Sequence, residues 1–148
     1  MSGLYYTSQV TAVLIGSKSG TTRTPVTLSS GYDVTTDSVK IFETGGFSKV
    51  NFDILYTMGA SETSNSIEMR VEVSPDRTNW YRLPNESNSS GTSTLTAREF
   101  TFVGTNGTTA TISIGLDSFY KFMKVAVKET GVSANAGTAY VEATLSGK

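Results

Sequence analysis

The segment from Ile67 to Leu83, which reads IEMRVEVSPDRTNWYRL, constrains the fold of this chain most strongly. Its first half alternates strictly between apolar and charged residues, and such alternation places successive side chains on opposite faces of an extended strand. Pro75 and Asp76 then favour a turn, and an aromatic pair opens the returning segment Trp80–Leu83. The segment predicts a β-hairpin that buries one face against the core of a sheet.

Strand patterns recur along the whole chain, whereas no segment keeps apolar residues at the 3.6-residue period of a helix. Many short strands in a chain of 148 residues are typical of one sandwich or barrel domain. We therefore predict an all-β fold in which residues 1–148 form a single β-sandwich or barrel. It should be jelly-roll-like and mainly antiparallel, with about eight to ten strands and little or no helix. The predicted strands are Tyr6–Ile15, Pro25–Leu28, Ser38–Phe42, Ser48–Met58, Ser66–Ser74, Trp80–Leu83, Thr94–Val103, Thr108–Ile114, Phe119–Lys128 and Thr138–Leu145.

Four of these strands indicate by alternation which of their faces is buried. Their opposite faces carry charged residues such as Lys49, Glu68, Lys124 and Glu142, which we expect in solvent. The apolar faces together form the predicted core. Its members are Val50, Phe52, Ile54, Tyr56, Met58, Ile67, Met69, Val71, Val73, Phe119, Met123, Val125, Val127, Ala139, Val141, Ala143 and Leu145.

Three segments rich in small polar residues separate the predicted strands. They are Gly16–Thr24, Pro84–Ser93 and Val132–Gly137. The second of them, PNESNSSGTS, has no apolar side chain apart from its proline and therefore cannot bury a face. We expect all three to be mobile loops.

The charge and the N-terminal sequence make several classes of partner unlikely on physical grounds. The net charge is −1, and the Lys and Arg residues form no run that would contact a phosphate backbone. Residues 1–16 have no charged region followed by a long apolar stretch, so we expect neither a signal peptide nor a spanning helix. The sequence thus predicts synthesis in a cytoplasm, with no nucleic acid and no membrane as partner.

Few residues are available for catalysis. The chain has no His and no Cys, which excludes His-dependent nucleophiles and the usual nitrogen- and sulfur-rich metal sites. A pair of carboxylates could still act as in glycosidases, but the sequence does not single out a pair among the 13 acidic residues. Asp33 and Asp37 are explained more simply as turn residues than as calcium ligands. We predict no enzymatic activity, no catalytic residue, no metal and no cofactor.

The turn after the strand Ser66–Ser74 is a candidate for contact with a partner. Asp76, Arg77 and Asn79 form its tip, and Trp80 and Tyr81 follow on opposite faces of the returning strand. We expect one of the two aromatic side chains in the core and the other near solvent. The exposed one could anchor a protein partner or stack on a sugar ring.

The N-terminus provides a second candidate for contact. Residues 1–9 include the adjacent aromatic residues Tyr5 and Tyr6 and show no clean alternation. They are interpreted either as an arm or edge strand buried against a neighbouring molecule, or as the beginning of an ordinary first strand of the sandwich.

Two segments of the chain resemble a known family of β-sandwiches. VEVSPDRTNWYRL is similar to the hairpin "strand, Ser-x-Asp-Gly-x-x-Trp, strand" of jelly-roll sandwiches, which include discoidin-like carbohydrate-binding modules and many phage structural proteins. FYKFMKVAVKE resembles the strand that pairs with this hairpin. The two segments cover about a fifth of the chain. Arg77 stands where the family usually has glycine, which indicates a different turn.

The resemblance, together with the richness in Ser, Thr and Gly, implies a small capsid decoration (cement) protein or related virion protein of a tailed bacteriophage. Such a protein is located in the virion, binds the major capsid protein or other virion proteins, and forms homo-oligomers, commonly trimers. The alternative implied by the same hairpin is a carbohydrate-binding or receptor-binding module of a tail or adhesin. That module would use Trp80 or Tyr81 to stack on a glycan.

Overall fold

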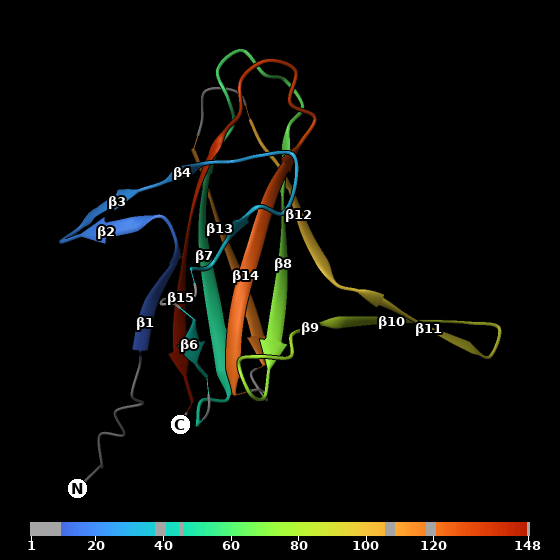
Figure 1. Cartoon of the computed structure of the whole chain (residues 1–148). Coiled ribbons are helices and arrows are strands. Elements are labelled where there is room, and N and C mark those ends of the chain that lie inside the picture. The colour runs from blue at the N-terminus through green and yellow to red at the C-terminus, as the bar shows by residue number, and fades with distance from the viewer. Residues whose placement is uncertain (1–9, 38–40, 45, 106–108, 118–120, 148) are drawn as a thin grey trace, which may run out of the picture.

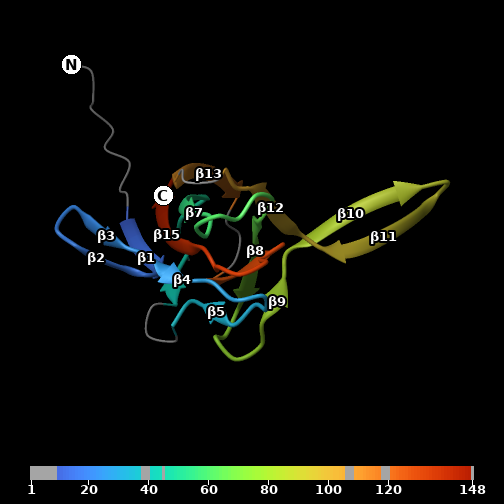
Figure 2. The same ribbon diagram turned by 90° about the horizontal axis from the view of Figure 1, so that it is seen from above.

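The computed structural model describes residues 10–37, 41–44, 46–105, 109–117 and 121–147. In this part of the chain all regular structure is β, in fifteen strands. Two antiparallel sheets lie face to face as a sandwich, and two narrow hairpins project from it to opposite sides (Figures 1 and 2). The predicted all-β fold is therefore confirmed, in the form of a sandwich and not of a closed barrel.

The first sheet has the order β1-β15-β7-β13, with the short strand β4 also paired to β15. Its central strands β15 and β7 pair along their whole length without an irregularity, and so do β7 and β13. The strands are β1 (Val10–Ile15), β4 (Val26–Thr27), β7 (Lys49–Thr57), β13 (Thr109–Asp117) and β15 (Thr138–Ser146).

The second sheet has the order β12-β8-β14-β5, with β6 also paired to β14 and β9 to β8. The strand Ser66–Ser74 is found with the predicted bounds, as β8. The other strands of this sheet are β5 (Val34–Thr35), β6 (Phe42–Glu43), β9 (Tyr81–Arg82), β12 (Glu99–Val103) and β14 (Phe122–Thr130).

The core lies between the two sheets and consists of the faces that alternation predicted. Every predicted core residue in the described ranges is buried, with the central strands β7, β8, β14 and β15 contributing alternate side chains. Phe119 lies outside the described residues. At roughly 25 cal/mol per Å² of apolar surface removed from water, this shared interior is the main favourable contribution to folding.

Two predicted loops are in fact hairpins. Pro84–Ser93 is not a mobile loop, because β10 (Pro84–Ser89) pairs with β11 (Thr92–Ala97) along its whole length. The predicted strand Thr94–Val103 is consequently divided between β11 and β12. In the segment 16–24, β2 (Ser17–Ser19) pairs with β3 (Thr22–Thr24). Neither hairpin pairs with the sandwich, so we call them the β10–β11 arm and the β2–β3 arm.

A buried carboxylate interrupts the apolar core at one end. Glu129 continues the inward face of β14 and is fully buried. Its oxygen Oε1 accepts hydrogen bonds from the Tyr56 hydroxyl (2.6 Å) and the Asn65 amide (3.2 Å), and Oε2 accepts one from the Gly137 N–H (2.6 Å). Gly137 cannot be replaced easily, since an added Cβ would overlap the carbonyl oxygen of Thr57 and crowd Glu129. The carboxylate thus joins both sheets and the segments that precede β8 and β15.

A second carboxylate fixes two loops at the same end of the sandwich. Glu62, which is only 4% exposed, lies between β7 and β8 and accepts hydrogen bonds from three successive backbone N–H groups of the β14–β15 loop. The donors are Asn135 (2.7 Å), Ala134 (2.7 Å) and Ser133 (2.9 Å). These bonds to the charged form hold the pKa of Glu62 below its usual value.

Replacing Glu129 by alanine should lower the free energy of unfolding by roughly 3 kcal/mol or more, because three buried donors lose their acceptor. Glu72→Ala is the control: Glu72 makes only a partly exposed ion pair with Lys124 at 3.8 Å, and its loss should cost about 0 to 1 kcal/mol. Urea unfolding followed by the fluorescence of the single tryptophan measures both values. Equal losses in the two variants would contradict the role assigned to Glu129.

The bonds to Glu62 should make part of the stability dependent on pH. The pKa of this carboxyl is lower in the folded chain than the ordinary 4.5, so its contribution is complete above that value and is lost as the pH falls below it. We expect the difference in unfolding free energy between the wild type and Glu62→Gln to be constant at neutral pH and to shrink below about pH 5. Urea titrations at a series of pH values test this, and a difference independent of pH would refute it.

Candidate interaction surface

The turn between β8 and β9 is organised by one aspartate. The carboxylate of Asp76 accepts hydrogen bonds from the backbone N–H groups of Asn79 (2.8 Å) and Thr78 (2.9 Å), and from the Asn79 side chain (2.7 Å). The hydroxyl of Ser74 accepts the N–H groups of Asp76 (3.2 Å) and Arg77 (2.9 Å). Because these donors favour the charged form, the pKa of Asp76 lies far below its usual value. The exposed tip of the turn is therefore held in one conformation by local hydrogen bonds.

Arg77 occupies the corner where the resembling hairpins have glycine. Its φ of 62° lies in the left-handed region that glycine adopts without cost. The strain is partly offset by two contacts: its carbonyl accepts the Trp80 indole N–H at 3.2 Å, and its guanidinium lies 5.5 Å from the centre of the Phe122 ring. The turn thus forms without glycine, and it places a cation at the end of the sandwich.

The structure does not place either aromatic residue of the returning strand in the core. Trp80 is half-buried on the outer face of the second sheet, where the Lys124 ammonium lies 4.3 Å from its ring centre. Tyr81 pairs with Val73 and is 58% exposed. The expectation that one of the two is in the core is wrong, because β9 is only two residues long and lies at the margin of the sheet, beyond the covered area.

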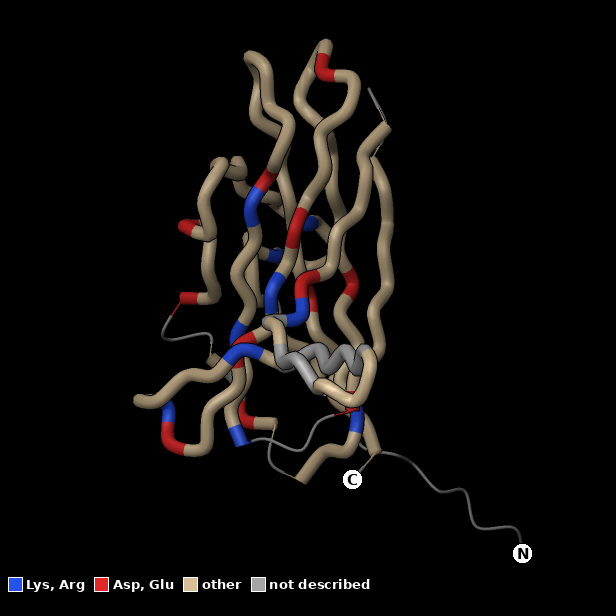
Figure 3. The backbone as a smooth tube through the Cα atoms, turned by 90° about the vertical axis from the view of Figure 1, so that its right-hand side faces the viewer, with Lys and Arg blue, Asp and Glu red and all other residues tan. Residues whose placement is uncertain are grey.

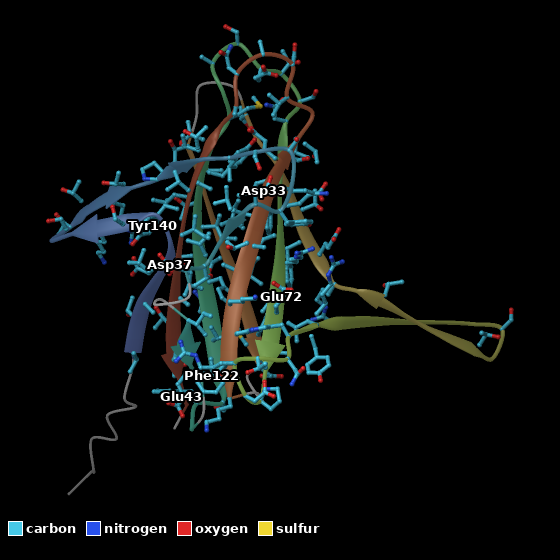
Figure 4. The ribbon with its side chains drawn as sticks, viewed as in Figure 1. Asp33, Asp37, Glu43, Glu72, Phe122 and Tyr140 are labelled. Carbon is cyan, nitrogen blue, oxygen red and sulfur yellow. The ribbon has the colours of Figure 1, made fainter. Side chains whose placement is uncertain are left out.

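The turn and the start of β14 together form one surface at an end of the sandwich. We define the turn surface as Arg77, Trp80, Lys121 and Phe122. Figure 4 shows Phe122 at this lower end, with Glu43 nearby. The Phe122 ring lies 5.5 Å from the Arg77 guanidinium and 5.4 Å from the Lys121 ammonium. Aromatic side chains that lie next to cations are suited to contacts with an acidic or ring-shaped partner group.

The β10–β11 arm is the feature that sequence reasoning missed most completely. It reverses at Ser90 and Gly91, both with positive φ (51° and 79°), as in a two-residue hairpin turn. At its base, the Arg98 N–H donates to the Leu83 carbonyl at 2.7 Å. The Ser-Gly pair between two equally long polar segments was the available signal. It is a weak one, because segments made mostly of Ser, Thr and Asn show no apolar alternation.

Charged side chains attach the β2–β3 arm to the first sheet. Lys18 lies 3.4 Å and Arg23 3.8 Å from a carboxylate oxygen of Glu142 on β15, and Arg23 also lies over the Tyr140 ring at 5.6 Å. Glu142 was expected in solvent but is 6% exposed, because this arm covers it. The pKa of Glu142 is lowered mainly by the hydrogen bond from the Tyr140 hydroxyl, and further by the positive charge of Lys18. Burial and the bond to Glu142 raise the pKa of Tyr140 to about 12.

Charges on the body of the sandwich are mixed in sign. Figure 3 shows Lys and Arg interleaved with Asp and Glu along the strands instead of gathered in one area. On the second sheet, Lys128 lies 2.9 Å from Glu68, and Lys124 lies 3.8 Å from Glu72. These side chains neutralise one another across β14 and β8, so they do not form a patch of one charge that would attract a partner.

The remaining sequence candidates can be stated briefly. Tyr5 and Tyr6 lie outside the described residues. The Asp33 carboxylate accepts a hydrogen bond from the Ser29 hydroxyl at 3.1 Å, within its own turn. Among the described residues, no three acidic side chains lie close enough together to hold a metal ion. The same residues include no helix that could span a membrane.

Comparison with protein-family models and with curated proteins does not assign this chain to a family. No protein-family model matches it, and no curated protein matches it significantly. The function must therefore be argued from the arms and the turn surface, together with the resemblance of the β8–β9 hairpin to jelly-roll sandwiches.

Proposed function

We propose that this chain is a structural virion protein without enzymatic activity, a capsid decoration protein of a tailed bacteriophage that binds the assembled shell as an oligomer and stabilises it. Its partners are then other copies of the chain, with a trimer as the favoured form, and the major capsid protein or other virion proteins. The proposal rests on one observation above the others, the β10–β11 arm. The resemblance of the hairpin segment Val71–Leu83 to those of phage structural proteins adds to it.

The arm supports this proposal because of its isolation. β10 and β11 pair with each other and with no other described strand, and Figure 2 shows them far out from the sandwich. A two-stranded hairpin is at best marginally stable in water when nothing packs against it. An arm of this kind contributes little to the fold that carries it. It gains order when it lies on another molecule, as a decoration protein lies on a shell.

The energetics of such a role require no chemistry at the site. A protein that binds the assembled shell and not its separate subunits shifts the equilibrium toward the shell by mass action. An oligomer engages several sites at once, which raises its effective affinity without any new type of contact. A rigid sandwich with projecting arms provides both the fixed geometry and the reach that this binding needs.

Shortening the arm tests the proposal directly. In the variant, residues 87–94 are replaced by Asn-Gly, which closes a two-residue turn between the paired residues Glu86 and Leu95. We expect the unfolding free energy to change by less than about 0.5 kcal/mol, and the affinity for shells to fall about tenfold or more. Co-sedimentation with phage heads that lack the protein measures the affinity.

Val132→Ser is the matched control, because it changes an exposed apolar residue (38% exposed) in the loop before β15 and leaves the arm intact. It should bind shells like the wild type. A wild-type chain that is monomeric and does not co-sediment with heads would refute the proposed function. Undiminished binding of the shortened variant would show that the arm is not the contact.

A carbohydrate-binding or receptor-binding module remains the second candidate, and the exposure of Tyr81 favours it. The ring is 58% exposed beside a turn that Asp76 holds in one conformation, an arrangement suited to stacking on a sugar.

Under the second candidate, Tyr81→Ala should abolish binding on a glycan array while the protein stays folded by circular dichroism. Val132→Ser is again the control, and its binding should be unchanged. Another tyrosine such as Tyr32 is less suitable, because the Tyr32 ring packs against the Arg70 guanidinium at 4.4 Å. An array without any signal for the wild type counts against this function.

A further inference from the structure

At one margin of the first sheet, the long strand β13 has an edge that nothing in its sequence protects from pairing with another strand. β13 is nine residues long and, in the described part of the chain, pairs with β7 alone. Its other edge therefore presents N–H and C=O groups that pair with no other described strand. Natural proteins usually protect such an edge by Lys, Pro, a bulge, a short strand or a cover. Residues 109–117, TATISIGLD, contain no Lys, Arg or Pro, and the pairing with β7 has no irregularity.

The other sheet margins are protected in these ways. β1, at the opposite margin of the first sheet, has a shift in register between Val13 and Ile15. β5 and β6 are two residues long. β12 is short and begins with the charged Glu99. Among the described strands, β13 is thus the one whose edge is open, long and regular.

The core-facing side chains of β13 are incompletely covered, which leaves room for an added strand. Ala110, Ile112 and Leu116 point toward the core but are only partly buried, whereas the equivalent positions on the central strands are fully buried. An additional strand would complete the cover over this side of the core.

We propose that the edge of β13 is the docking site for residues 1–9 of a second copy of this chain, which add to the first sheet as a further strand. The inference rests on the proposed function, since it specifies how the copies of the decoration protein meet. Residues 1–9, MSGLYYTSQ, equal β13 in length and contain no charged side chain and no Pro. Tyr5, Tyr6 and Thr7 are of types that favour extended structure.

Residues 1–9 of the same molecule fit this edge less well than those of a second copy. They are joined to β1, and β15 and β7 lie between β1 and β13. From β1 to a position beyond β13 the segment would cross four strand spacings, which span roughly 19 Å and use about six residues of extended chain. Of residues 1–9, only about three would then lie along an edge of nine residues. A neighbouring molecule can donate the whole segment, and a head-to-tail contact of this kind can close into a ring such as a trimer.

The test measures mass and amide exchange of the full chain in the absence of shells. The variant is Tyr5→Ser together with Tyr6→Ser, and the control is Val132→Ser, which removes an exposed apolar side chain outside the proposed contacts. We expect the wild type and the control to be oligomers by light scattering, with β13 amides that exchange about tenfold more slowly than in the double variant. The synthetic peptide MSGLYYTSQ, added to the double variant, should restore the protection of β13, and a scrambled peptide should not.

Three results overturn the inference. They are β13 amides that exchange rapidly in both proteins, β13 amides that are equally well protected in both proteins, and protection that does not depend on protein concentration. The second result would indicate a different occupant, and the third would indicate the chain's own segment. Because no shell is present, a negative result in this experiment does not bear on shell binding by the β10–β11 arm. A negative result in the shell experiment likewise does not bear on the pairing of residues 1–9 with β13.

Discussion

The burial of two alternating apolar faces against each other is the constraint on which the rest of the structure depends. β7 and β15 on one sheet and β8 and β14 on the other each place every second side chain in the shared interior. A shift of one residue in any of these pairings would turn an apolar row into solvent. The exact register of the four central strands therefore fixes where the loops begin, and with them the turn surface and the points from which both arms leave.

The ends of the sandwich are fixed by different means. At one end, Glu129 and Glu62 accept hydrogen bonds from segments that would otherwise be joined only through the chain. At the other end, Asp76 organises a single turn through bonds within the turn itself. The first arrangement couples both sheets, whereas the second leaves its neighbourhood independent. The exposed aromatic and cationic side chains lie at the second end, where the turn keeps its conformation without bonds to the rest of the sandwich.

Sequence reasoning could predict those parts of the fold that bury one face and expose the other. β8 was predicted to the residue because Ile67 to Val73 alternate without exception. Both arms escaped prediction because a hairpin that is polar on both faces has no alternation. Glu129 escaped because the buried face of β14 ends in a carboxylate, whose partners come from distant segments. The expectation that Trp80 or Tyr81 fills the core was wrong, since aromatic character favours the core but cannot show that β9 lies at the margin of the sheet.

The independence of the β10–β11 arm gives the chain a modular construction. Every pairing within the arm is between residues close in sequence, and its tip at Ser90 and Gly91 is exposed. Evolution can therefore lengthen, shorten or exchange this element without repacking the interior, so related molecules could share one sandwich and differ in reach. The same tip is a natural place to insert a foreign peptide for display, because the inserted residues would lie far from the core that folds the protein.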